Sequence, residues 1–165
     1  LDGIGPVIEY VRHPTDFNVV KSVTKTLMEL SHSMPIRAGS RPTISVYNVL
    51  DIPNITNWWA EMMDKYYTEP FNEKTWLNYT QVALPEFLSL PVLNKRCKDI
   101  VMESLWDKGP TNNQKQNWNQ LCNYMNSTNL THLTPQFIDF TNKLDNARRE
   151  SFIKTVPEFS SLWEY

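Results

Sequence analysis

Four polar residues stand where α/β proteins place their ligand-binding side chains. Asp2 follows what reads as the end of a strand, and Asn48 and Gln81 lie at or near the ends of two further predicted strands. Ligands of α/β barrels and open α/β sheets bind at the carboxyl ends of the strands. Arg12 lies in the loop after the first of these ends, and a guanidinium can bind a carboxylate through two parallel hydrogen bonds. Together the four residues would suit a small ligand that carries a ribose and a carboxylate.

Each of these residues also has a purely structural interpretation. Asp2 can cap the turn over residues 3–6, because short acidic side chains accept hydrogen bonds from turn amides. Asn48 and Gln81 can satisfy backbone groups of their own loops. The sequence holds no Gly-x-Gly-x-x-Gly, no P-loop and no Gly-x-Ser-x-Gly, and its three histidines are scattered. Local motifs therefore give no complete catalytic constellation and predict no metal ligand.

Length and composition limit the classes of protein that remain. The 165 residues, 41% hydrophobic and 21% charged, suit one ordered domain or part of a larger one. A net charge of −2 gives no basic surface for nucleic acid, and no apolar run is long enough for a membrane helix. Cys97 and Cys122 are too few for a disulfide framework and lack zinc-ligand spacing. We expect reduced thiols in a cytoplasmic protein without nucleic-acid or membrane partners.

The first half of the chain reads as α/β. Residues 43–50 and 76–82 have the β-branched and aromatic character of buried strands. Residues 1–14 read as a Gly/Pro loop, Thr15 caps a helix before the first strand, and a helix opening at residues 51–54 lies between the strands. Helix–strand–helix–strand order is typical of parallel α/β units with right-handed crossovers. The two helices are expected to bury Phe17, Val20, Val23, Leu27 and Leu30, and Ile55, Trp58, Trp59, Met62 and Tyr66.

The second half reads as nearly all helix. Helices are predicted over residues 95–106 and 113–125, and a further helix runs from Thr134 towards Phe152. A short aromatic tail over residues 156–165 is expected to dock on the rest. The division predicts one unit over residues 1–92 and a helical extension over residues 93–165.

The predicted sheet is too small to stand alone. Parallel sheets are buried on both faces and usually have more than two strands. Residues 1–2 read as the end of a third strand, so we expect further residues upstream of Leu1. An α/β barrel or an open sheet would supply the remaining strands.

The order of these segments resembles a known family. Residues 2–5 followed by residues 9–12 resemble the segment after the fourth barrel strand of radical SAM enzymes. Residues 43–54 with Trp58 and Trp59 look like strand five and its helix, and residues 78–90 look like strand six and its loop. Asn142-Lys143-Leu144-Asp145 with Arg148, and residues 156–159, are similar to the tail of twitch-domain radical SAM proteins of phage and environmental sequences. The resemblance covers nearly the whole chain.

The resemblance implies a fold, two cofactors and roles for the four polar residues. The chain would be the C-terminal part of a partial (β/α)6 barrel, residues 1–92, followed by a mostly helical extension. The family binds a [4Fe–4S] cluster through a Cys-x-x-x-Cys-x-x-Cys loop, and the cluster cleaves S-adenosylmethionine (SAM) to begin hydrogen abstraction from a substrate. By position, Asp2 would lie near SAM, Arg12 at its carboxylate, and Asn48 and Gln81 near its ribose or adenine.

The chain also departs from the family pattern. It lacks the cluster-binding loop, so it would be inactive alone and would need the missing N-terminal half of the barrel as its partner. Cys97 and Cys122 are too few and too far apart to indicate an auxiliary cluster. A peptide substrate is expected only by analogy with related enzymes. The alternative is a non-catalytic α/β interaction module that uses its aromatic-rich helices, because six Trp and seven Tyr suit an interface as well as a core.

Overall fold

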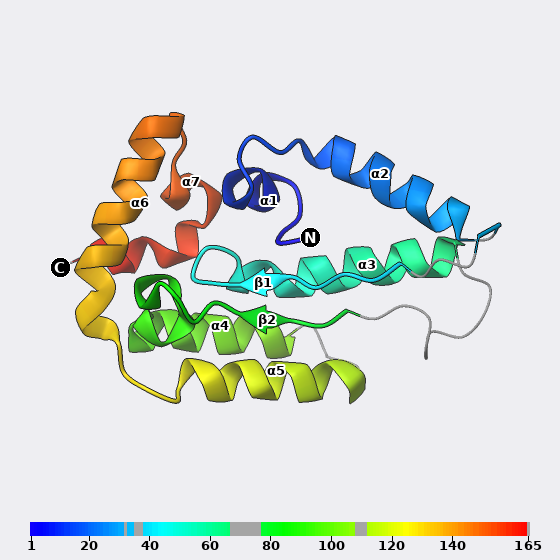
Figure 1. Ribbon diagram of the computed structural model, residues 1–165. Coiled ribbons are helices and arrows are strands. Elements are labelled where there is room, and N and C mark those ends of the chain that lie inside the picture. The colour runs from blue at the N-terminus through cyan, green and yellow to red at the C-terminus, as the bar shows by residue number, and fades with distance from the viewer. Residues whose placement is uncertain (32, 35–37, 67–76, 108–111, 165) are drawn as a thin grey trace.

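The computed structural model describes residues 1–31, 33–34, 38–66, 77–107 and 112–164. Helices make up most of this part of the chain, and two short parallel strands form its sheet (Figure 1). The predicted α/β class is therefore confirmed in this coarse form. The elements are α1 (Pro6–Val11), α2 (Phe17–Leu30), β1 (Thr43–Ile44), η1 (Val49–Asp51), α3 (Ile52–Tyr66), β2 (Thr80–Gln81), α4 (Lys95–Asp107), α5 (Asn112–Met125), α6 (Thr134–Arg148), α7 (Phe152–Thr155) and η5 (Pro157–Trp163), with shorter 3-10 turns between some of them.

The two strands are parallel neighbours, with Thr43 opposite Thr80 and Ile44 opposite Gln81. The helix α3 connects them, as a parallel pair requires a crossover connection. The strand predicted over residues 43–50 is wrong beyond Ile44, because the side chain of Asn48 accepts the backbone N–H of Ser45 at 2.8 Å. That local bond competes with strand pairing and turns the chain towards η1. The second predicted strand is confirmed at residues 80–81, while its first residue, 76, lies outside the described residues.

The segment predicted as a loop contains the short helix α1. Pro6 lies in its first turn, where the missing proline N–H costs no hydrogen bond. Gly5 precedes it with φ 53°, a left-handed backbone that favours glycine. Gly3 has no room for a side chain, because a Cβ there would lie 2.7 Å from the nitrogen of Ile8. These glycines and this proline build the tight entry to a helix, although the same residue types led us to predict a loop.

The N-cap residue of α2 lies one position later than predicted. Asp16, and not Thr15, is the N-cap residue: its carboxylate accepts the N–H of Asn18 at 2.7 Å. The hydroxyl of Thr15 donates instead to the carbonyl of Arg12.

The burial predicted for α2 is wrong on one face. Phe17 and Met28 are buried, but Val23, Leu27 and Leu30 are 53%, 47% and 41% exposed. The spacing of these residues predicts a core stripe, but the described residues leave that stripe uncovered. The helix α3 does follow its prediction, with Ile55 and Trp59 buried and Trp58, Met62 and Tyr66 packed on a small second core.

One main core joins both halves of the chain. Tyr47 packs its ring 5.4 Å from Phe137 and 5.2 Å from Phe152, measured between centroids. The predicted boundary after residue 92 therefore falls inside a continuous core. The tail docks as expected, with Phe159 and Leu162 fully buried.

The C-terminal helices follow their local patterns with one difference. The helix α6 ends at Arg148, four residues before Phe152, because Arg149 adopts a left-handed backbone with φ 57°. Ser151 then caps α7 by accepting the N–H of Lys154. Within the described residues, none of these helices or the others is long and apolar enough to cross a membrane.

Candidate functional site

Asp2 covers the edge of β1 that faces away from β2. Its Oδ1 accepts the N–H of Thr43 at 2.6 Å, and its Oδ2 accepts Nε of Arg12 at 2.5 Å. The carbonyls of Pro42 and Ile44 accept N–H groups from the β2 segment instead. Successive residues of a parallel strand direct their backbone groups to opposite edges. The carboxylate of Asp2 therefore lies at the strand edge, beside Thr43, the first residue of β1.

Asn48 is buried beside Asp2 and binds the backbone of both Asp2 and β1. Its Nδ2 donates to the carbonyl of Asp2 at 2.8 Å and to the carbonyl of Thr43 at 2.9 Å, and its Oδ1 accepts the N–H of Ser45. The residue is 1% exposed. Both amide donors and the amide oxygen thus have internal partners. The structural interpretation of Asn48 accounts for all of its side-chain polar atoms.

Gln81 lies apart from the other three residues. It pairs with Ile44, whose side chain is fully buried, and side chains of paired residues share one face of a sheet. Asp2 binds the backbone N–H of Thr43 at the edge of β1 that faces away from β2, so β1 lies between Asp2 and Gln81. The structure therefore brings together Asp2, Arg12 and Asn48, and the expected convergence of all four residues is corrected for Gln81.

A pocket of about 310 Å³ lies at the carboxyl ends of the two strands. We call it the strand-end pocket; its lining includes Asp2, Arg12, Thr43, Ser45, Val82 and Arg148. Its walls come from the N-terminal loop, α1, the two strand ends and α6. The position agrees with the place where ligands bind in α/β proteins.

Two guanidinium groups reach the strand-end pocket. Arg12 has a 58% exposed side chain, and its Nε is held by Asp2 while its two Nη atoms have no partner among the described residues. Arg148 donates from Nη1 to the carbonyl of Tyr10 at 3.1 Å and has no acidic partner within the described part of the chain. Two guanidinium groups against one carboxylate favour an anionic group in this pocket.

Our prediction of the site did not include Arg148. The residue lies at the far end of the chain from Arg12, and no local pattern marks it as a pocket residue. The hydroxyl of Tyr10, which donates to Asp145 at 2.8 Å, fixes the end of α6 against α1. This long-range contact directs Arg148 towards the pocket.

Two tyrosines of the pocket wall stay protonated. Burial raises the pKa of Tyr47 to about 12, with a smaller opposing effect from the hydrogen bond to Thr141. Burial also raises the pKa of Tyr10, and its hydrogen bond to Asp145 acts in the same direction. Both phenols therefore offer neutral O–H groups near neutral pH and do not act as phenolate bases.

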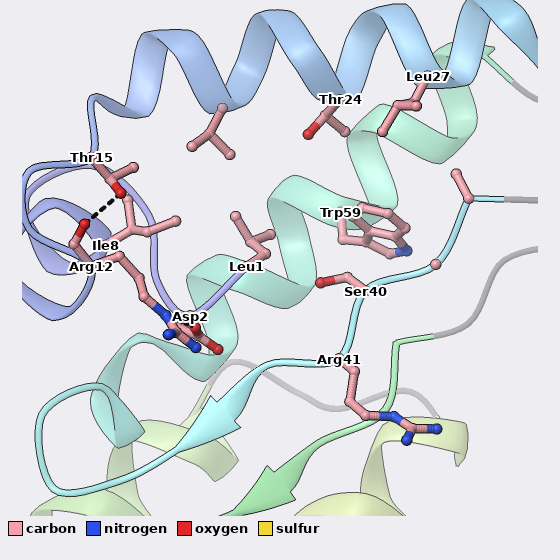
Figure 2. A pocket seen from close by; sticks show the side chains of 13 residues that line it. Leu1, Asp2, Ile8, Arg12, Thr15, Thr24, Leu27, Ser40, Arg41 and Trp59 are labelled. Atoms are coloured by element: carbon pink, nitrogen blue, oxygen red, sulfur yellow. Dashed lines mark hydrogen bonds and ion pairs between the residues drawn. The ribbon is translucent and has the colours of Figure 1, made fainter.

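A second, larger hollow of about 740 Å³ lies between α1, α2, α3 and residues 38–41 (Figure 2). We call it the α2–α3 cavity; Leu1, Ile8, Leu27, Ser40 and Trp59 line it, and it shares Asp2 and Arg12 with the strand-end pocket. The hydroxyl of Ser40 and the indole nitrogen of Trp59 are buried without a hydrogen-bond partner in the described residues. Buried polar atoms without a partner are costly.

The cysteines do not fit a site for an iron–sulfur cluster. Cys97 is buried on α4 and Cys122 is half-buried on α5. Burial raises the pKa of both thiols, whereas the thiolate is the form that binds metal. Within the described residues, no group of His, Cys, Asp and Glu could hold a metal ion.

Comparisons of the chain with protein-family models, with curated proteins and with solved structures give no match.

Proposed function

We propose that this chain is the C-terminal part of a radical SAM enzyme. Residues 1–92 would complete a partial (β/α)6 barrel with an N-terminal half, and residues 93–165 would form a helical extension over its strand ends. The observation that carries the proposal is the ion pair of Asp2 and Arg12 at the rim of the strand-end pocket. The parallel β1–α3–β2 order supports the same interpretation.

Arg12 is the residue that would bind the carboxylate of SAM. Its Nε is occupied by Asp2, so its Nη edge remains for two parallel hydrogen bonds to a carboxylate. Asp2 is a positioning residue, because its two oxygens already accept from Thr43 and Arg12 and its side chain is only 6% exposed. Arg148 supplies a second positive charge at the far wall, which would attract an anionic group of either SAM or substrate.

The remaining chemistry belongs to groups outside this chain. A [4Fe–4S] cluster with bound SAM would supply radical chemistry for hydrogen abstraction from a substrate. Neither Cys97 nor Cys122 suits the cluster, so its cysteine loop would come from the N-terminal half. What this chain contributes is orientation of SAM and exclusion of water by α6. A peptide is the substrate class suggested by analogy with related enzymes.

A non-catalytic α/β interaction module is the second candidate, and the exposed apolar face of α2 is the observation that favours it. Several of the Trp and Tyr residues that suggest a module lie in the main core, among them Tyr10, Tyr47 and Trp118. A module would therefore use the aliphatic face of α2. It predicts a monodisperse 165-residue chain with a cooperative thermal transition.

The test uses the longer protein encoded upstream of Leu1. We expect that protein to contain a Cys-x-x-x-Cys-x-x-Cys loop and to form 5′-deoxyadenosine from SAM under reducing, anaerobic conditions. Arg12→Gln should weaken SAM binding about 30-fold, since a charge-assisted hydrogen bond contributes about 2 kcal/mol. Lys95→Gln, at a side chain that is 88% exposed on α4, is the matched control and should leave SAM binding unchanged.

Two results would overturn the proposal. An upstream sequence without the cysteine loop would remove the cofactor chemistry and favour the interaction module. Unchanged SAM affinity in Arg12→Gln would remove the Asp2–Arg12 pair from the SAM site.

A further inference from the structure

Three residues of α6 that line the strand-end pocket lie on one face of that helix. Phe140, Leu144 and Arg148 are spaced four residues apart, so they follow one another over about 12 Å of the helix axis. The first side chain is aromatic, the second aliphatic and the third cationic. We propose that this row binds a small apolar carboxylic acid lengthwise, with the carboxylate at Arg148 and the apolar group at Phe140. The inference deepens the proposed function, on which it rests only in calling this ligand the substrate.

Arg148 has the capacity to bind the carboxylate of a ligand. It donates from Nη1 to the carbonyl of Tyr10 at 3.1 Å, and a guanidinium group has five N–H donors in all. Asp145, nearly one turn earlier on α6, accepts from the hydroxyl of Tyr10 and the N–H of Phe152. Within the described part of the chain, Arg148 forms no ion pair. Its remaining donors therefore suit an anionic acceptor that enters the pocket.

Most hydroxyl groups of the pocket lining already have partners inside the protein. Of the four hydroxyl side chains in the lining, that of Tyr10 donates to Asp145 and that of Tyr47 pairs with Thr141 at 2.9 Å. The hydroxyl of Ser45 accepts the N–H of Tyr47 at 3.2 Å. These three groups hold the wall together, so the guanidinium groups provide most of the polar contacts that remain for a ligand.

A positively charged ligand group would find no free carboxylate in the pocket. Both oxygens of Asp2 already accept, one from Thr43 and one from Arg12, and its side chain is only 6% exposed. Asp2 and Arg12 neutralise each other, so the charge of Arg148 leaves the pocket with a net positive charge. We therefore infer a ligand that carries a carboxylate and no ammonium group, such as an N-acylated amino acid or the C-terminal residue of a peptide.

The apolar part of the lining comes from α6 and from the segment after β2. Val82 and Leu88 face the pocket from that segment, together with Phe140 and Leu144 of α6. Phe140 is 36% exposed, and the ring of Phe87 lies 5.1 Å from its ring, between centroids. An apolar group that covers these side chains is removed from water with them. The volume of about 310 Å³ lies at the small end of the roughly 300–1,000 Å³ of ligand pockets, which suits a ligand of about one residue.

Arg12 remains available for SAM in this arrangement. It borders the α2–α3 cavity as well as the strand-end pocket, whereas Arg148 borders only the strand-end pocket of these two hollows. The two guanidinium groups can therefore bind two different carboxylates, that of SAM at Arg12 and that of the substrate at Arg148.

The first experiment titrates probes into the 165-residue chain by calorimetry. N-acetylphenylalanine should bind in the millimolar range or more tightly. Its uncharged amide and acetate should each bind weaker by about tenfold or more, because one lacks the charge and the other the apolar group. 3-Phenylpropionate and N-acetyl-diglycyl-phenylalanine then distinguish a free acid from a peptide carboxyl terminus. Tighter binding of either one supports the same apolar carboxylate chemistry.

The second experiment locates the bound probe with two pairs of variants. Arg148→Gln should weaken the binding of N-acetylphenylalanine by about tenfold or more, whereas Lys143→Gln, at a 74% exposed cation of the same helix, should not. Phe140→Ala should weaken it about fivefold through loss of ring contact. Met102→Ala, at a similarly exposed apolar position of α4, is the matched control and should leave the affinity unchanged.

Three results would overturn the inference. Equal affinity for the acid and its amide would remove the carboxylate contact, and this comparison needs no variant. Absence of acid binding at millimolar concentration would do the same, because every lining group named here belongs to this chain. Parental affinity in Arg148→Gln would place the carboxylate away from α6.

Failure of this inference can be told apart from failure of the proposed function, because these measurements use neither SAM nor a cluster. Acid binding that depends on Arg148, together with a SAM affinity that Arg12→Gln does not change, would keep the inference and overturn the proposed function. SAM binding that depends on Arg12, without acid binding, would keep the proposed function and overturn the inference.

Discussion

The hydroxyl of Tyr10 donates a 2.8 Å hydrogen bond to Oδ1 of Asp145, across 135 positions of sequence. The other carboxylate oxygen of Asp145 accepts the N–H of Phe152 at 2.9 Å, so one side chain fixes α6 to both α1 and α7. Arg148 returns a bond to the carbonyl of Tyr10. The two ends of the chain therefore build one wall of the strand-end pocket together.

The carboxylate of Asp2 should be needed for the local fold. Asp2→Asn keeps the size of the side chain but replaces one acceptor oxygen with an NH₂ group. That group would face the N–H donor of either Thr43 or Arg12, and the hydrogen bond there would be lost. We expect the free energy of unfolding to fall by about 1–3 kcal/mol, the cost of a buried donor without an acceptor. Urea unfolding of the 165-residue chain measures this change.

The control for this substitution is Asp139→Asn. That carboxylate pairs with Lys143 on the surface of α6 and is 63% exposed, so the change in unfolding free energy should stay within about 0.5 kcal/mol. Equal effects of the two substitutions would contradict the role of Asp2 at the edge of β1.

Alkaline pH should destabilise the fold through Tyr47. Its pKa in the folded state is raised to about 12 from 10.0, so between these values the unfolded chain loses a proton that the folded chain keeps. The stabilisation is complete below pH 10 and is lost as the pH rises towards 12, at about 1.4 kcal/mol per pH unit. Tyr10 acts in the same direction because its pKa is also raised.

The measurement compares the parent chain with Tyr47→Phe. At pH 9 the variant should be about 1 kcal/mol less stable, because it loses the hydrogen bond between Tyr47 and Thr141. That deficit should shrink as the pH rises to 11.5, because the variant lacks the titrating phenol. A constant difference across this range would show that Tyr47 ionises normally in the fold.

Two phenylalanines of α6 should differ sharply when truncated. Phe137 is fully buried between Tyr47 and Phe152, so Phe137→Ala should cost about 3–5 kcal/mol of unfolding free energy. Phe140, three residues later on the same helix, is 36% exposed, and Phe140→Ala should cost clearly less. Urea unfolding of both variants provides the comparison; similar losses would place Phe140 in a tighter core than its exposure indicates.

Local patterns in the sequence were sufficient for several elements. The stripe of Ile55 and Trp59 predicted α3, and Thr134 with its following proline predicted the start of α6. Such signals depend on residues within one or two turns of each other, so neighbouring side chains carry them fully. The sequence also marked Asp2 and Arg12 as candidate ligand-binding residues near a strand end, but it did not predict that their side chains bind each other, as they do at 2.5 Å.

Other features were decided only by contacts between distant segments. Asn48 holds the carbonyl of Asp2, 46 positions earlier, and the register of β2 against Ile44 sets the face on which Gln81 lies. Arg148 reaches the pocket only because Asp145 binds Tyr10. Strand length, strand face and pocket walls depend on which partner a segment meets, and a periodic pattern within one segment does not specify that partner. The amino-acid sequence alone therefore determined the longer helices, and tertiary structure determined the extent of the sheet, the contact between Asp2 and Arg12, the second arginine and the cavity beside α2.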